Sequence, residues 1–106
     1  MSTRLAKLEE MLAADPKNQL ASYGLAQELA NLGRLDEAVA QFERLLADHP
    51  NYCYGYFHGG RALEGLGRLE EARAMYHRGL DAAARSGDQH AQSEIQAALE
   101  GMQAGR

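Results

Sequence analysis

The stretch Gly33-Arg34-Leu35-Asp36-Glu37-Ala38 returns almost unchanged as Gly67-Arg68-Leu69-Glu70-Glu71-Ala72. We call the distance in sequence from Gly33 to Gly67 the repeat spacing. In each copy a glycine and an arginine precede an apolar residue, two acids and a small residue. Glycine commonly ends a helix, and acids are favoured in the first turn of the next helix because its dipole places partial positive charge there. Each copy therefore predicts a junction between two helices, and the recurrence predicts a repeated helix pair.

The repeat extends well beyond this junction. Aligning residues 19–50 with residues 53–84 gives 10 identities in 32 positions, among them Leu29 with Leu63 and Arg44 with Arg78. Apolar residues three and four apart are typical of amphipathic helices. They predict helices over residues 3–14, 18–32, 35–48, 52–66 and 69–84, followed by a turn over residues 85–88 and a last helix that ends near residue 103.

The segment from Tyr52 to Phe57 has the composition of a strand, with four aromatic residues among six. The repeat places it opposite residues 18–23, which are predicted to be helical. Tertiary context outweighs propensities of a few tenths of a kcal/mol per residue, so a helix is predicted here too. Gly59 and Gly60 weaken this helix and are predicted to lie where two helix backbones pass closely.

The repeat unit resembles the tetratricopeptide repeat. Ala38, Phe42 and Pro50 match the alanine, aromatic and proline of that family's pattern, and Ala72 with Tyr76 matches it again. The chain departs from the pattern at Ser22, where an aromatic residue is usual, at Leu29 and Leu63, where tyrosine is usual, and at Ala84, where a proline would close the second unit.

The resemblance implies an all-α fold, a right-handed α-α superhelix of about six stacked antiparallel helices. It implies a single domain over residues 1–106. The expected parts of this domain are a half repeat (3–15), two repeats (18–50 and 52–84) and a capping helix (88–103).

Composition argues against several classes of function. The net charge is −4, the pI is near 5.5, and acids and bases are interspersed, so no basic face for nucleic acid or anionic membrane is predicted. The N-terminal segment is amphipathic, which predicts neither a signal peptide nor a membrane span. The chain has one cysteine, Cys53, and a lone thiol favours a reducing compartment, so a cytoplasmic location is expected.

In tetratricopeptide arrays the first helix of each pair lines a concave groove that holds a peptide or helix of a partner protein. Carried onto this sequence, the groove includes Leu20 and Asn31 in the first unit and Glu64 in the second. The side chains expected to bind the partner are Tyr23, Gln27, Tyr54, Phe57, His58 and Arg61.

Two alternatives stay open for these side chains. Tyr23 and Phe57 could instead fill gaps between helices, and Arg61 could simply pair with Glu64 or Glu28. The lysines and asparagines with which some family members grip a terminal carboxylate are absent, since Tyr23, Gln27, Tyr54 and His58 stand there instead.

Enzymatic, metal-binding and cofactor-binding functions are not predicted. The chain has no nucleophile turn, no phosphate-binding glycine loop after a strand, and no distinctive carboxylate pair. Cys53, His49 and His58 have the wrong spacing for a tetrahedral zinc site. A second hypothesis is a homodimer or larger assembly, because the first predicted helix lacks a preceding partner for its apolar surface, formed by Leu5, Leu8, Met11 and Leu12.

Overall fold

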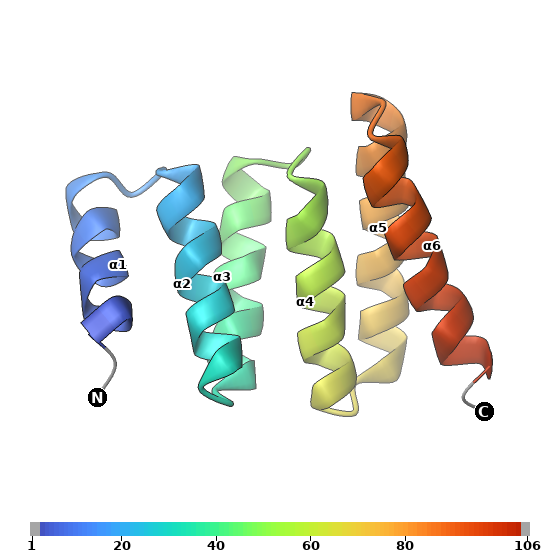
Figure 1. Cartoon of the computed structure of the whole chain (residues 1–106), viewed down its shortest axis with the longest axis horizontal. Helices are drawn as coiled ribbons and strands as arrows, with labels where there is room; N and C mark the ends of the chain where they lie inside the picture. The colour runs from blue at the N-terminus through green and yellow to red at the C-terminus, as the bar shows by residue number, and fades with distance from the viewer. Residues whose placement is uncertain (1–2, 105–106) are drawn as a thin grey trace.

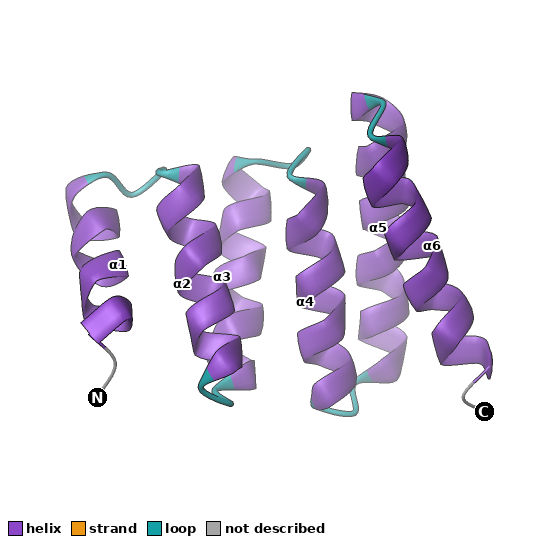
Figure 2. Ribbon diagram, viewed as in Figure 1, coloured by secondary structure: helices purple, strands orange, loops and turns teal. Residues whose placement is uncertain are grey.

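The computed structural model describes residues 3–104 and has six helices and no strand in that range (Figure 2). The helices are α1 (Thr3–Ala14), α2 (Gln19–Asn31), α3 (Leu35–Asp48), α4 (Cys53–Gly65), α5 (Leu69–Ser86) and α6 (Gln89–Ala104). The predicted all-α solenoid of stacked helices is therefore confirmed. Residues 1–2 and 105–106 of the predicted domain lie outside the described residues.

The helices form two layers. Figure 1 shows α2, α4 and α6 side by side toward the viewer, with α3 and α5 behind them and α1 at the N-terminal edge. We call α2, α4 and α6 the front layer and α3 and α5 the back layer. The molecule measures 40 × 29 × 18 Å, and the two termini lie at opposite ends of its long axis.

The repeated stretch forms the same helix end twice. Gly33 has φ +79° and Gly67 has φ +74°, the left-handed conformation that costs glycine little. The Arg34 amide donates to the Leu29 carbonyl at 2.9 Å, and the Arg68 amide donates to the Leu63 carbonyl at 3.0 Å. These bonds close a Schellman motif at each junction, so the glycines end α2 and α4 as predicted.

Helix starts are also close to the predicted positions. The Asn18 side chain accepts a hydrogen bond from the Ala21 amide at 2.9 Å and caps α2, while Asp88 caps α6 through the Ala91 amide at 3.0 Å. The strand-like segment is helical from Cys53 onward, and the partly buried Tyr52 precedes that helix. Helix formation therefore prevails over strand propensity in this segment.

The end of α5 differs from its prediction. This helix continues to Ser86, whereas the predicted helix stops at residue 84 and a turn follows over residues 85–88. The second unit has alanine at position 84, where a proline would have ended the helix, and the left-handed Gly87 (φ +69°) ends it instead. The turn is correspondingly shorter than predicted.

The core consists of two adjoining clusters along the stack. One joins α1, α2 and α3 and includes Ala38 and Phe42, whereas the other joins α3 to α6 and includes Ala72 and Tyr76. All four of these residues are 0 % exposed. Tyr52 packs against both clusters and so connects them. The alanine and aromatic positions of the repeat thus form the core.

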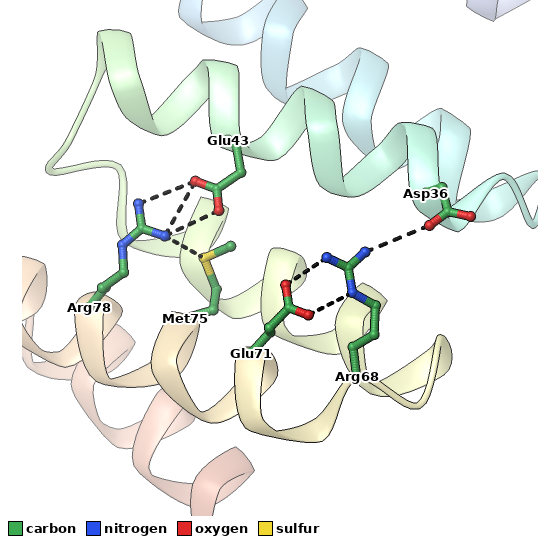
Figure 3. Close-up of polar contacts among 6 residues, drawn as sticks. All are labelled: Asp36, Glu43, Arg68, Glu71, Met75 and Arg78. Carbon is green, nitrogen blue, oxygen red and sulfur yellow. Dashed lines mark hydrogen bonds and ion pairs between the residues drawn. The ribbon is translucent and has the colours of Figure 1, made fainter.

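Long side chains connect the two helices of the back layer (Figure 3). Arg78 of α5 pairs with Glu43 of α3 at 3.2 Å, and Arg68, just before α5, approaches Asp36 of α3 at 3.7 Å. Arg68 also makes a bidentate contact with Glu71 at 2.6 and 2.9 Å. These arginines therefore join one repeat to the next on the side opposite the front layer.

Candidate functional site

A continuous row of aromatic and imidazole rings crosses the front layer from α2 to α6. His58 of α4 lies at its centre, 5.8 Å from Tyr23 of α2, 6.5 Å from Tyr54 and 5.0 Å from Phe57, measured between ring centroids. Tyr54 in turn lies 6.3 Å from His90 of α6. We call the following set the ring row: Tyr23, Tyr52, Tyr54, Phe57, His58 and His90.

Tyr23 takes part in both the core and the surface. Its ring meets Phe42 edge-on at 6.4 Å and lies 5.0 Å from Tyr52, while its hydroxyl accepts a hydrogen bond from Gln27 at 3.3 Å. Burial, reinforced by the neighbouring Tyr52 and Tyr54, raises the pKa of Tyr23 to about 12. Tyr23 therefore fills a gap between helices, as one of the two alternatives had it, and keeps part of its ring at the surface.

His58 is an uncharged member of the row at neutral pH. It is partly buried, and burial together with the nearby Arg61 lowers its pKa below the ordinary value of 6.5, an effect that Glu94 opposes. A neutral imidazole surrounded by rings presents a flat polarisable surface with hydrogen-bonding nitrogens. The centre of the ring row therefore combines aromatic surface with a polar group.

Arg61 extends the row along α4. Its guanidinium lies over the Phe57 ring, 5.8 Å from the centroid, and it makes no ion pair with any residue in the described range 3–104. The alternative in which Arg61 pairs with Glu64 or Glu28 is not seen among the described residues. Glu64 instead accepts a hydrogen bond from the Tyr76 hydroxyl, and Glu28 pairs with Arg4 at 3.6 Å. Arg61 therefore offers its N–H donors to the solvent.

A recess of about 430 Å³ lies beside Arg61, between α4 and α6. Small residues of α6 give it room, and Glu94 at its edge pairs with His90 at 3.2 Å. Its polar groups are two acids and one base. The recess is lined by Phe57, Arg61, Glu64, Glu94, Ala97, Ala98 and Gly101.

All six predicted binding residues meet on this surface, with Gln27 joined to the row through Tyr23. Leu20 and Asn31 line another recess, between α1 and α2, which adjoins the row at Tyr23. The prediction missed Tyr52 and His90. The start of α6 lies farther from the start of α4 than one repeat spacing, so looking one repeat spacing after the α4 residues does not find His90. His90 is the second residue of α6, as Tyr54 is of α4.

The described residues contain neither a metal site nor a membrane span. Within residues 3–104 no three His, Cys, Asp or Glu side chains are grouped as a metal site would require. None of the six described helices is both long and apolar enough to cross a membrane.

The family follows from comparison with known proteins. The sequence model described as a tetratricopeptide repeat matches residues 5–58. A tetratricopeptide repeat domain protein from Salinibacter ruber is 35% identical with a TM-score of 0.74, and the match covers 80% of this chain and 86% of that one. The chain belongs to the tetratricopeptide repeat family. This membership supports a general role as a protein–protein interaction module.

Two further structures share the tetratricopeptide arrangement. A protein from Bordetella parapertussis is 31% identical with a TM-score of 0.81, and the match covers 94% of this chain and 87% of that one. The first tetratricopeptide repeat domain of Spaghetti (RPAP3), bound to the HSP90 peptide SRMEEVD, is 22% identical with a TM-score of 0.81, covering 95% and 75% of the two chains, and it shows the shared fold. No relative was found among curated protein sequences.

Proposed function

We propose that the front layer binds a peptide segment or a helix of a partner protein along the ring row. The observation that carries this proposal is the continuity of the row, which reaches from Tyr23 on α2 through His58 on α4 to His90 on α6. A ligand lying across three helices would meet rings that lie against one another, which limits the freedom of the more buried ones. The entropic cost of binding is then small for the area buried.

The chemistry of the surface supports a ligand with apolar side chains and free backbone groups. Tyr54 and Phe57 are partly exposed and meet edge-on at 6.3 Å, so they offer adjacent aromatic faces. Arg61 has donors for ligand carbonyl groups. The recess beside it, with its floor of small α6 residues, has room for an apolar side chain of the ligand.

An acidic ligand is not favoured on this surface. The Spaghetti domain is bound to SRMEEVD, which has three acidic side chains. Here Glu64 and Glu94 line the recess, and the accompanying base, Arg61, lies over Phe57. Carboxylates brought beside these acids would be repelled. We therefore propose a neutral or basic apolar segment as the ligand.

This proposal makes the protein an adaptor or scaffold and not an enzyme, with the cytoplasm as its place of action. The thiol of Cys53 is buried and contacts the Asn51 carbonyl and the Ser86 hydroxyl at 3.5 and 3.6 Å. A buried unpaired thiol supports residence in a reducing compartment.

The test uses ligands selected without knowledge of the natural partner. Random dodecapeptides displayed on phage are selected against the whole chain, and the best are synthesised and titrated by fluorescence anisotropy. We expect Tyr54→Ala with Phe57→Ala to weaken binding at least about tenfold, since buried aromatic anchors each contribute on the order of 2 kcal/mol. Chemical shift changes on adding peptide are expected on α2, α4 and α6.

A matched control changes the exposed side chains of the back layer, with Arg44→Ala and His77→Ala together. Circular dichroism establishes that both double variants stay helical. If the selected peptides bind the ring variant as tightly as the unaltered chain, the ring row is not the binding site. Selection of acidic sequences whose chemical shift changes fall on α4 and α6 would contradict the proposed ligand chemistry alone.

A further inference from the structure

A second recess lies between α1 and α2, at the N-terminal end of the stack, and adjoins the ring row only at Tyr23. It measures about 530 Å³, and its apolar lining includes Leu8, Met11, Leu20 and Gly24. Met11 is 40% exposed and Leu20 is 73% exposed, which places both among the exposed large apolar side chains of the described residues. Apolar surface of this kind is typical of a docking site.

The repeat shows what shape of partner suits this surface. Phe42 and Leu45 lie one repeat spacing after Leu8 and Met11, and both are 0 % exposed in a core cluster with α2 residues. On α3 this stripe packs against α2, the first helix of the same repeat. Helix α1 has the corresponding stripe. The recess is therefore suited to a helix lying along α1 and against α2.

One residue, Arg4, makes the stripe on α1 differ from those on the later helices. Arg4 stands where the two complete repeats have Ala38 and Ala72, which are 0 % exposed. An arginine at this position prevents the close approach that alanine permits. A helix seated here lies farther from α1 and meets a guanidinium group, which favours a facing carboxylate.

The other side chains around the recess also favour a ligand with carboxylates. Arg4 and Lys7 line the apolar stripe on α1, and the two cavities along it have no carboxylate in their linings. The carboxylate of Glu28 is paired with Arg4 at 3.6 Å, and the Glu28 side chain is 15% exposed. Lys7 makes no ion pair within residues 3–104. The linings of these two cavities therefore carry basic and no acidic side chains, although Glu9 and Glu10 of α1 lie outside them and the chain carries a net charge of −4.

We propose that this recess binds an acidic amphipathic helix of another protein. Its apolar side chains pack on Leu8, Met11 and Leu20, and its carboxylates face Arg4 and Lys7. The ligand differs in charge from that of the ring row, and the inference does not depend on a ligand being bound there.

A second copy of this chain fits the recess less well. Beyond Met11 and Leu20, the large apolar side chains exposed in residues 3–104 are Leu32 and Leu69, each at a separate helix junction. These isolated residues form no apolar helix face that could enter the recess.

The test compares two stapled peptides of roughly 16 residues, a length at which an isolated helix forms with a staple's help. Both have leucine every third and fourth position; one has glutamate on the flanks of the leucine stripe and the other has lysine there. Binding to the whole chain is measured by anisotropy at low and high salt, with chemical shifts to locate the site. We expect the acidic peptide to shift α1 and α2 but not α6, and the basic peptide to bind there at least about tenfold more weakly.

Charge reversal at Lys7 sharpens the test. Lys7→Glu is expected to weaken the acidic peptide about tenfold and to strengthen the basic one, whereas Lys17→Glu, the same change at an exposed site outside the recess, leaves both unchanged. Equal affinity of the two peptides, or no shifts on α1 up to about 1 mM, overturns the proposal. So does a dimer in sedimentation that Leu20→Ala dissociates, since a second copy would then occupy the recess.

Discussion

Gly60 of α4 lies directly against the ring of Tyr76 of α5, so closely that a Cβ atom on residue 60 would stand 2.2 Å from Cε1 of that ring. Tyr76 is 0 % exposed and its hydroxyl donates to Glu64, so the ring has little freedom to move. Gly60 therefore makes room for the repeat's aromatic residue. The prediction gave a different reason for this glycine, the close passage of two helix backbones, whereas the nearest atoms belong to the Tyr76 side chain.

Replacing Gly60 by alanine is expected to destabilise the fold by about 1–3 kcal/mol, because the overpacked core outweighs the gain in helix propensity. The matched control is Gly101→Ala in α6, where a Cβ atom meets nothing within 4 Å. That change is expected to stabilise by about 0.5–1 kcal/mol. Urea unfolding measures both, and a Gly60→Ala variant as stable as the unaltered chain would show that Tyr76 can move aside.

Ser22 and Gln41 form a buried polar link between α2 and α3. The Gln41 amide donates to the Ser22 hydroxyl at 2.9 Å, and Gln41 is 8% and Ser22 5% exposed. Ser22→Ala leaves a buried amide without its partner, so we expect a loss of about 1–3 kcal/mol. Combining Ser22→Ala with Gln41→Leu removes both polar groups and is expected to restore most of that loss. The prediction fails if the double change costs as much as the sum of the single changes in a denaturation cycle.

Arg78 of α5 contacts residues of three helices, α3, α4 and α5 itself. It pairs with the half-exposed Glu43 at 3.2 Å and donates to the Met75 sulfur at 3.7 Å (Figure 3). Its guanidinium also lies over the Tyr56 ring, 5.4 Å from the centroid. Glu43→Gln removes the ion pair alone and is expected to cost no more than about 1 kcal/mol, an effect that salt at about 1 M largely removes. Arg78→Ala also removes the ring contact and is expected to cost about 0.5–1 kcal/mol more. Equal costs at low and high salt would contradict this division.

The sequence predicted the regular part of the fold because each junction depends on local chemistry. A left-handed glycine needs no distant partner, and Gly33 and Gly67 take the same conformation in both copies of the repeated stretch. The end of α5 also lies at a left-handed glycine, Gly87, but the predicted helix stopped at residue 84, before Ser86. Arg85 in its last turn donates to Asn51 Oδ1 at 3.0 Å and to the Pro50 carbonyl at 3.2 Å, contacts with a loop far away in sequence.

The later end of α5, at Ser86, also explains why the candidate site was predicted only in part. The six expected residues follow from the corresponding faces of α2 and α4, which the repeat itself aligns. The place of His90 depends on where α6 begins, which the longer α5 sets. The orientation of Arg61 over Phe57 depends on Tyr76, whose hydroxyl engages Glu64, the carboxylate otherwise nearest in sequence. Contacts between residues far apart in the chain produce no periodic pattern in the sequence, so they could not be predicted from it.

His58 is expected to make stability depend on pH below neutrality. Its pKa in the folded chain is below the ordinary value of 6.5, chiefly through burial and then through Arg61. Between 6.5 and that lower value the unfolded chain binds a proton that the folded chain does not, so stability is full above 6.5 and falls as the pH drops through this window. His58→Gln removes this contribution.

The free energy of unfolding in urea, measured from pH 7.5 to pH 5, should therefore decrease more for the unaltered chain than for His58→Gln. His77→Gln, at an exposed position of α5, is the matched control and should keep the dependence of the unaltered chain. The imidazole carbon protons of His58, followed by NMR over the same range, report the pKa directly. A value at or above 6.5, or identical pH profiles for the unaltered chain and His58→Gln, would show that the ring row does not disfavour a charged His58.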